Sequence, residues 1–276
     1  MNYETRTVRP PGLGVEFDVL REDTIIGPAI EQGAWEDHET GLFLSHIRPK
    51  CTVLDLGANV GWFSVQAIRA GANVHAFEPV PGIADVAERN IERANKVGPG
   101  HGVLHRYAAG DKAGTASIAL AAKNRGDNRV TDGELPADMQ DAETVEIQIA
   151  AVDDFVDTPV RVMKIDTQGS EWLALQGAKA TLARSPKLAL LLEFWPYALR
   201  GAKPEQLLEL LAAEGFRMGK ATAAPYPMAA DRILKQALAR DPVKGGLDLY
   251  GTRGLPFHVF GAKARLRSTW RSVRED

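Results

Sequence analysis

Residues 53–63, with the sequence VLDLGANVGWF, constrain the fold of this chain more than any other stretch. A short apolar run ends at Asp55, Gly57 and Gly61 bracket a loop, and an apolar segment with helical character begins at Trp62. This pattern predicts a buried strand, a glycine loop and a helix. Glycine lets the backbone come close to a ligand, and the N–H groups at a helix start are free to bind it. We therefore expect a site for a nucleotide-like cofactor in this segment.

The spacing of the two glycines argues against a dinucleotide. The dinucleotide fingerprint is G-x-G-x-x-G, and its second glycine makes room for a pyrophosphate. Here Ala58 and Asn59 follow Gly57, and the next glycine is Gly61. Glu78 stands at the end of the next apolar run, where a carboxylate can accept two hydrogen bonds from a ribose diol. A cofactor that contains a single nucleoside therefore fits this segment better.

The pattern after the loop predicts a mostly parallel sheet. Apolar runs with strand character alternate with segments of helical spacing, of which residues 83–94 are the clearest. Strands separated by such helices pair in parallel, and ligands bind at the carboxyl ends of the strands. We expect an α/β fold with helices on both faces of the sheet. Within it we expect strands at residues 24–26 and 102–109, one helix over residues 172–182 and a long polar loop over residues 123–143.

Length and composition fit one α/β domain with appendages. The chain has 276 residues, of which 45% are hydrophobic and 25% are charged, which is enough for one sizeable core. The net charge of -3 provides no overall attraction to nucleic acid. The single cysteine, Cys51, excludes an internal disulfide and suits a reducing cytosol. No apolar run approaches the roughly 18–20 residues that span a bilayer, so we expect a cytoplasmic protein without a transmembrane segment.

A second motif follows a later apolar strand. In KIDTQGSE, Asp166 stands where the strand should end, and Glu171 falls in the first turn of a helix. A carboxylate at a strand end can act on a ligand, and it can equally cap the next helix. The next apolar strand ends in LLEFWP, which brings Glu193 and Trp195 to the same edge of the sheet. Glu193 is a candidate for contact with substrate, and an ion pair with Arg200 is the alternative.

The two motifs together, VLDLGANVGWF with FEP after it and KIDTQGSE with LLEFWP after it, resemble the FkbM family of methyltransferases over about residues 50–215. The resemblance implies a Rossmann-like class I methyltransferase fold with S-adenosylmethionine as the cofactor. It also implies O-methylation of sugars, glycans, lipids or secondary metabolites. The sequence departs from the family pattern at Thr167 and at Gln168, where a glutamate is common. We therefore expect an N-terminal leader or lid (1–50), an S-adenosylmethionine-binding catalytic domain (51–252) and a basic C-terminal tail (253–276).

The residues expected to contact the cofactor come from the glycine loop and from the ends of several strands. They are Asp55, Gly57, Ala58, Asn59, Gly61, Trp62, Phe63, Glu78, Pro79, Ala109 and Asp166. Methyl transfer from a sulfonium requires alignment of donor and acceptor, and a hydroxyl acceptor also has to lose its proton to a base. Asp166 is the first candidate for this catalytic base, and Glu193 is the second.

The acceptor is expected to contact the polar loop and the second motif. The candidate substrate-binding residues are Asn128, Arg129, Glu171 and Trp195. A solvated charged loop is the alternative for the first two. Trp35 and Glu36 either line the mouth of the pocket or pack beneath the leader. No spacing of histidines or carboxylates requires a metal ion, so we expect no obligatory metal.

Three other functions stay open on the sequence alone. They are N-methylation of an amino sugar, oxidation or reduction with a nicotinamide cofactor, and cofactor binding without catalysis. The expected partner is a small-molecule or glycan acceptor, and a homo-oligomer is left open. Residues 262–274 carry five basic side chains around Leu266 and Trp270, namely Lys263, Arg265, Arg267, Arg271 and Arg274. Such a tail could make peripheral contact with an anionic membrane or a phosphorylated substrate, and a solvated terminal helix is the alternative.

Overall fold

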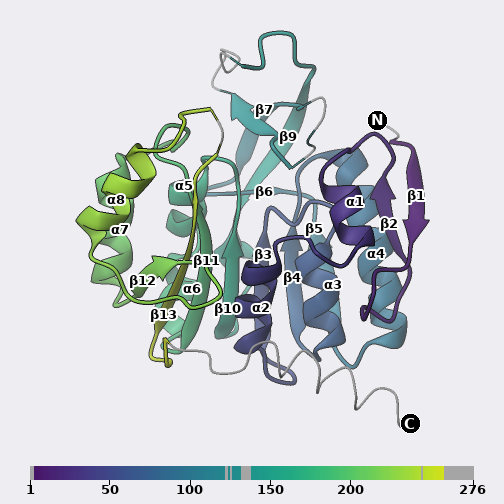
Figure 1. Cartoon of the computed structure of the whole chain (residues 1–276), viewed down its shortest axis with the longest axis horizontal. Helices are drawn as coiled ribbons and strands as arrows, with labels where there is room; N and C mark the ends of the chain where they lie inside the picture. Colours follow the sequence, from purple (N-terminus) through teal and green to yellow (C-terminus); the bar gives the residue numbers. More distant parts are fainter. Residues whose placement is uncertain (1–2, 122–123, 125, 132–137, 244, 258–276) are drawn as a thin grey trace.

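A seven-stranded sheet forms the centre of the molecule, with helices on both of its faces (Figure 1). The computed structural model describes residues 3–121, 124, 126–131, 138–243 and 245–257. The strand order is β12-β13-β11-β10-β3-β4-β5, and β13 runs antiparallel to both of its neighbours while the others are parallel. The strands are β3 (Thr52–Leu56), β4 (Asn73–Phe77), β5 (His101–His105), β10 (Val160–Ile165), β11 (Leu188–Phe194), β12 (Arg217–Lys220) and β13 (Leu247–Arg253). This confirms the expected α/β fold, a mostly parallel sheet with helices on both faces.

Burial on both faces explains why the central strands read as unbroken apolar runs in the sequence. Successive side chains of a strand point to opposite faces, and both faces of a parallel sheet are covered by helices. In β3, Val53 packs into one core cluster while Leu54 and Leu56 pack into the other. All three side chains are fully buried. The first glycine loop therefore follows a strand that is fixed from both sides.

Two groups of helices supply the two cores. One face is covered by α2 (Asp37–Ser45), α3 (Trp62–Arg69) and α4 (Pro81–Val97). The other face is covered by α5 (Glu171–Gln176), α6 (Lys179–Arg184), α7 (Pro204–Ala213) and α8 (Ala230–Leu238). The sequence analysis did not predict α8, whose Ile233 and Ala237 pack into the second core. Both groups leave the carboxyl ends of the central strands uncovered.

The N-terminal segment packs onto the first core. Strands β1 (Thr5–Val8) and β2 (Phe17–Leu20) form an antiparallel hairpin, and Asn90 of α4 bonds to both backbone groups of Asp18. The strand expected at residues 24–26 is wrong, because helix α1 (Ile26–Glu31) begins there. The Asp23 carboxylate accepts hydrogen bonds from the N–H groups of residues 25, 26 and 27, which is how a side chain starts a helix.

A second, smaller sheet rises beside the carboxyl ends of the central strands (Figure 1). Its order is β6-β9-β7-β8, built from β6 (Ala108–Gly110), β7 (Gly114–Ala119), β8 (Arg129–Thr131) and β9 (Thr144–Ala151). The single strand expected over residues 102–109 is therefore wrong. The chain leaves the central sheet after His105, whose carbonyl accepts the N–H of Glu78, and β6 pairs with β9 instead. Strand β8 also falls in the segment that was expected to be a loop.

The helix expected over residues 172–182 is divided at Gly177. A Cβ on Gly177 would lie 1.9 Å from the carbonyl oxygen of Gly110, so the chain passes β6 at a distance that only glycine allows. Asp153, in the short 3-10 helix Val152–Asp154, accepts hydrogen bonds from the N–H groups of Ala180 and Thr181. These bonds stabilise the start of the next helix, α6. The close approach to the second sheet explains the break.

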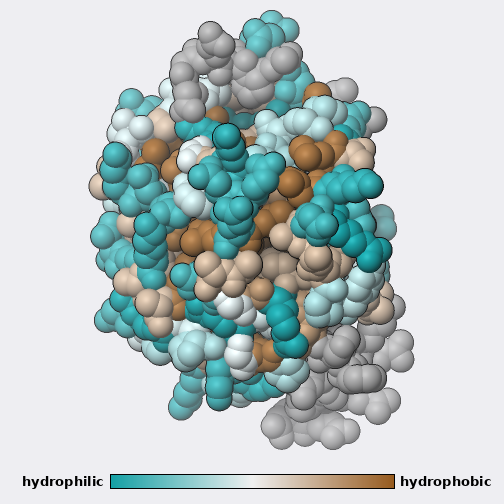
Figure 2. All heavy atoms as spheres, turned by 90° about the vertical axis from the view of Figure 1, so that its left-hand side faces the viewer, coloured by the Kyte–Doolittle hydropathy of each residue, from teal (hydrophilic) through white to brown (hydrophobic). Residues whose placement is uncertain are grey.

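The surface around α8 carries several exposed apolar side chains. Figure 2 views the molecule from the left of Figure 1 and shows hydrophobic side chains in a central band between hydrophilic ones. Tyr197, Tyr226, Leu238 and Val243 are among the exposed large hydrophobic residues. Within the described ranges, no helix has both the length and the apolar character needed to cross a bilayer. The basic segment 262–274 lies outside the described residues.

Candidate active site

A cavity that opens to solvent lies at the carboxyl ends of β3, β4 and β10, and its empty space, open solvent included, is about 850 Å³. The glycine loop after β3 forms its floor, and Gly57, Asn59 and Gly61 all have left-handed backbone angles, with φ of 83°, 50° and 88°. The N–H groups of Gly57 and Ala58 both donate to the carbonyl oxygen of Phe77, at 3.0 and 2.9 Å. These bonds fix the loop against the end of β4, so that the cavity is formed by rigid backbone.

Glu78 lies at the end of β4 and lines the cavity with only 6% of its surface exposed. Its Oε2 accepts the N–H of Asn59 at 2.9 Å, and its Oε1 accepts the N–H of Val80 at 3.0 Å. Burial raises the pKa of this carboxyl to about 7, and the two backbone donors only partly oppose it. Each oxygen keeps a lone pair for a ribose hydroxyl, so the chemistry of this position fits the nucleoside part of S-adenosylmethionine.

Most of the predicted cofactor-binding residues meet at this cavity. Its lining includes Gly57, Ala58, Asn59, Trp62, Phe63, Glu78, Pro79, Ala109 and Asp166. Asp55 and Gly61 do not line it. Asp55 is fully buried behind the loop and accepts the hydroxyl of Ser64 at 2.6 Å, while Gly61 forms the N-cap of α3. These two residues shape the loop from behind.

Several residues that line the cavity were not predicted from the sequence. Lys164 lines it from within β10, and Gln168 lines it from the loop after that strand. The second sheet adds Ile118 and Val130, and the N-terminal segment adds Trp35 and Glu36 at the positions considered above. A lysine near the end of the mostly apolar strand VRVMKI, two residues before Asp166, is the signal that could have identified it.

Lys164 and Asp166 form a buried ion pair beside the glycine loop. The Lys164 Nζ lies 2.8 Å from Oδ2 of Asp166, and the ammonium also lies over the ring of Phe63, 4.8 Å from its centroid. Burial lowers the pKa of Lys164, but the carboxylates of Asp166, Glu36 and Asp55 outweigh burial and raise it above its ordinary value. Lys164 therefore stays charged beside Asp166. Asp166 does not cap α5, whose N-cap is Ser170.

Gln168 bridges the two carboxylates that were predicted to be catalytic. It has the left-handed φ of 51°, and its Nε2 donates to Oδ1 of Asp166 at 2.7 Å and to Oε2 of Glu193 at 2.8 Å. The other oxygen of Glu193 accepts the N–H of Gly246 at 3.2 Å. Burial, followed by the charges of Asp166 and Glu171, raises the pKa of Glu193. Glu193 does not line the large cavity, and its hydrogen-bond partners in the described chain are Gln168 and Gly246 rather than Arg200.

Glu171 holds the loop after β10 and does not face the cavity. Its Oε1 accepts the N–H groups of Thr167 and Gly169 at 3.1 and 3.0 Å and the Thr167 hydroxyl at 3.0 Å. The side chain is fully buried, and burial raises its pKa to about 7. The expectation that Glu171 contacts the acceptor does not fit this position, because its partners are within its own loop.

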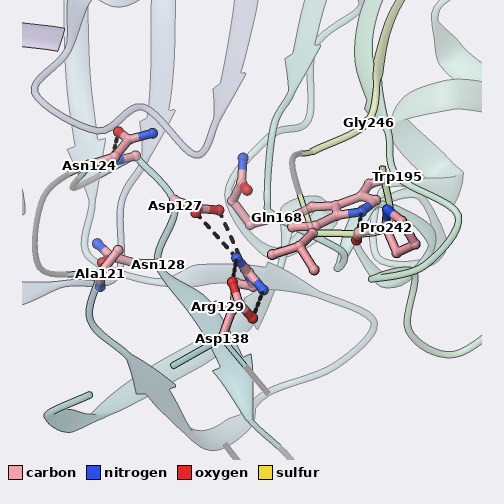
Figure 3. Close-up of polar contacts among 12 residues, drawn as sticks. Ala121, Asn124, Asp127, Asn128, Arg129, Asp138, Gln168, Trp195, Pro242 and Gly246 are labelled. Carbon is pink, nitrogen blue, oxygen red and sulfur yellow. Dashed lines mark hydrogen bonds and ion pairs between the residues drawn. The ribbon is translucent and has the colours of Figure 1, made fainter. Parts of the chain in front are cut away.

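Arg129 also lies behind the cavity wall instead of facing the acceptor. Figure 3 shows its guanidinium between Asp127 and Asp138 and beside Trp195. It is 2.7 Å from Asp138 and 3.2 Å from Asp127, and the Trp195 indole donates its N–H to the carbonyl oxygen of Pro242 at 3.0 Å. The expected substrate contacts of Arg129 and Trp195 therefore do not fit the structure. Both side chains join the second sheet to the central one.

Of the four predicted substrate-binding residues, Asn128 is the one that lines the cavity. Its Oδ1 accepts the N–H of Ala121 at 2.8 Å, which closes the base of the segment between β7 and β8. Among the described residues, no group of three or more His, Cys, Asp or Glu side chains is arranged to hold a metal ion. The part of the cavity at Glu78 thus suits a nucleoside, and Trp35, Glu36 and Asn128 line a second part of it.

Comparison with known proteins places the chain in a family. Residues 55–218 match the model of the methyltransferase FkbM domain, and no protein with a curated description matches significantly. Among solved structures, an FkbM methyltransferase from Methylobacillus flagellatus KT is 18% identical, with a TM-score of 0.44 over 73% of this chain and 43% of that one. This chain therefore spans less than half of that relative.

Two further solved structures cover more of their own length. A magnesium protoporphyrin IX methyltransferase from Synechocystis PCC 6803 with bound S-adenosylmethionine is 12% identical, with a TM-score of 0.46 over 84% of this chain and 85% of that one. An O-methyltransferase from Bacillus cereus in complex with S-adenosylhomocysteine is 16% identical, with a TM-score of 0.41 over 78% and 80%. These similarities are too distant to assign an activity, and the assignment rests on the domain match. The chain belongs to the FkbM family of S-adenosylmethionine-dependent methyltransferases.

Proposed function

We propose that this chain transfers the methyl group of S-adenosylmethionine to a hydroxyl group of a sugar, a glycan or a similar polyhydroxylated metabolite. The observation that carries the proposal is the single cavity that joins the Glu78 end to a second end lined by Trp35, Asn128, Glu36 and Asp166. An aromatic face beside amide and carboxylate oxygens suits an acceptor with an apolar ring face and several hydroxyl donors.

Different residues would bind the cofactor and position the acceptor at the two ends of the cavity. The methyl group of a bound S-adenosylmethionine is already activated by its sulfonium, so the protein has to align donor and acceptor and exclude water. Glu78 and the loop at Gly57 would hold the nucleoside. Asp166, fixed by Lys164 and Gln168, would accept a hydrogen bond from a ligand at the junction of the two ends.

The charge of the second end narrows the choice of acceptor. Among the described residues that line the cavity, three are carboxylates, Glu36, Glu78 and Asp166, and one is a cation, Lys164, which is already paired with Asp166. No unpaired cation of the described lining would stabilise a phosphate or another anion, so a neutral polyol fits better. An amino sugar, with N-methylation, is the second candidate because carboxylates also bind an ammonium.

The test combines cofactor binding with a panel of acceptors. Calorimetric titration with S-adenosylhomocysteine measures the cofactor end. Incubation with S-adenosylmethionine and the methyl glycosides of neutral hexoses, deoxyhexoses and amino hexoses, read by mass spectrometry, measures the acceptor end. We expect micromolar binding and an O-methylated product from a neutral glycoside. Methylation only on nitrogen would favour the second candidate, and binding without any product would refute the glycoside acceptor.

A further inference from the structure

Three carboxylates line the large cavity, and their hydrogen bonds differ. Both oxygens of Glu78 accept backbone N–H groups. Both oxygens of Asp166 are taken by Lys164 and Gln168. Within the described part of the chain, the carboxylate of Glu36 has neither a hydrogen bond nor an ion pair, although the residue is partly buried and lines the cavity. Glu36 is thus the cavity carboxylate whose lone pairs remain open to a ligand.

The backbone holds Glu36 in a costly conformation at this position. Its φ of 46° and ψ of 54° are left-handed, which is uncommon for a residue with a side chain and is found mostly where the surroundings enforce it. Thr40 supplies much of that constraint. Its N–H donates to the carbonyl oxygen of Glu36, its hydroxyl donates to the carbonyl oxygen of Trp35, and the same hydroxyl accepts the indole N–H of Trp62. Glu36 is therefore tied to the start of α3, beside the cofactor loop.

The environment of Glu36 raises the pKa of its carboxyl group. Lys164 and Asp166 face it from β10, Asp248 from β13 and Glu39 from its own helix α2. Burial raises the pKa of Glu36 to about 8; Lys164 opposes this, and the three carboxylates add to it. Because Lys164 is already paired with Asp166, it cannot also neutralise Glu36.

We infer that Glu36 is the base that takes the proton of the acceptor hydroxyl, an inference that rests on the proposed O-methylation. In this step the acceptor oxygen forms the new bond to the methyl carbon, and the bond between that carbon and sulfur breaks with its electron pair going to sulfur. The hydroxyl proton goes to the Glu36 carboxylate. Both oxygens of Asp166 already accept hydrogen bonds, from Lys164 and Gln168, so Asp166 serves to hold a ligand in place.

The test compares Glu36→Gln, Glu36→Asp and Asp37→Asn with the wild type on the methyl glycoside panel. Asp37 is the exposed neighbour of Glu36 and does not line the cavity, so Asp37→Asn is the matched control. We expect Glu36→Gln to lower kcat by about 10²–10⁴-fold, the usual effect of a general base, without changing the affinity for S-adenosylhomocysteine. Glu36→Asp should recover part of the loss. The rise of the wild-type rate with pH through about 8 should be missing in Glu36→Gln.

Two results would overturn the inference. The first is an unchanged kcat in Glu36→Gln. The second is an equal loss of rate and of S-adenosylhomocysteine affinity, which would make Glu36 a cofactor ligand. If the wild type methylates no glycoside, the proposed function fails on its own, and Glu36 is judged by infrared titration of the S-adenosylhomocysteine complex. A protonated carboxyl band that titrates near pH 8 and disappears in Glu36→Gln supports a proton-accepting Glu36, and its absence refutes it.

Discussion

The guanidinium carbon of Arg129 lies 4.6 Å from the centroid of the Trp195 ring, and this contact joins the second sheet to the central sheet (Figure 3). Arg129 belongs to β8, whereas Trp195 directly follows β11. The same guanidinium pairs with Asp127 and Asp138. One side chain thus pairs with two carboxylates and packs against the ring of Trp195.

Replacing Arg129 with glutamine should destabilise the protein by about 2 kcal/mol, because two partly buried carboxylates lose their counter-ion. Arg106 provides a matched control, since it also pairs with two carboxylates, Asp85 and Glu88, but is 41% exposed. Arg106→Gln should change stability by less than about 1 kcal/mol. Urea unfolding measures both. Equal losses would show that the contact with Trp195 and its burial contribute nothing.

Replacing Glu78 with glutamine should weaken S-adenosylhomocysteine binding by about tenfold or more, because a charged acceptor of the ribose hydroxyls is lost. The wild-type affinity should rise as pH increases through about 7, since burial raises the pKa of Glu78 to about 7 and the ionised form is the better acceptor. Glu78→Gln should lack this dependence. Calorimetry at several pH values checks it, with Glu88→Gln on the exposed side of α4 as the control.

Replacing Gly57 with alanine should cost about 3 kcal/mol or more and abolish cofactor binding. The φ of Gly57 is 83°, and a Cβ there would lie 1.9 Å from the backbone oxygen of Asp166, which cannot move without shifting β10. Gly114→Ala is the control, because a Cβ at Gly114 would meet nothing within 4 Å. Thermal unfolding of both variants decides the matter. Similar melting temperatures would mean that the loop at Gly57 can move away from the backbone of Asp166 without loss of stability.

Replacing Gln168 with glutamate should make stability more sensitive to pH. The variant loses the amide that donates to Asp166 and Glu193 and places a third carboxylate between them. The folded variant should therefore bind more protons than the unfolded chain and lose stability relative to the wild type as pH rises from about 5 to 8. Thermal unfolding across this range, with Gln148→Glu in β9 as an exposed control, measures the effect. A loss independent of pH would point to packing instead.

The cofactor half of the site could be predicted from the sequence because short-range pattern determines it. Glycine spacing, an apolar strand and a terminal carboxylate lie within one stretch of chain, and Glu78 follows on the adjacent strand. The same reasoning predicted where β11 ends, because a run that is buried on both faces has a sharp boundary.

The other half depends on contacts between distant segments, which a single sequence does not reveal. Whether Arg129 faces a ligand or an indole is decided by where β8 lies against the end of β11. The division of a helix at Gly177 depends on the passage of Gly110 beside it. Glu171 shows the same limit within one motif, because its Oε1 bonds to its own loop and the side chain is fully buried instead of facing a ligand.

The separate origin of the two ends of the cavity has a consequence for how such enzymes diversify. Glu78 and the loop at Gly57 belong to the central sheet, whereas Asn128 and Val130 come from the second sheet and Trp35 from the N-terminal segment. Insertions or exchanges in these two peripheral segments can alter acceptor preference while the donor site keeps its sequence. Grafting residues 114–151 from a relative with another acceptor is therefore a direct route to a new specificity on this scaffold.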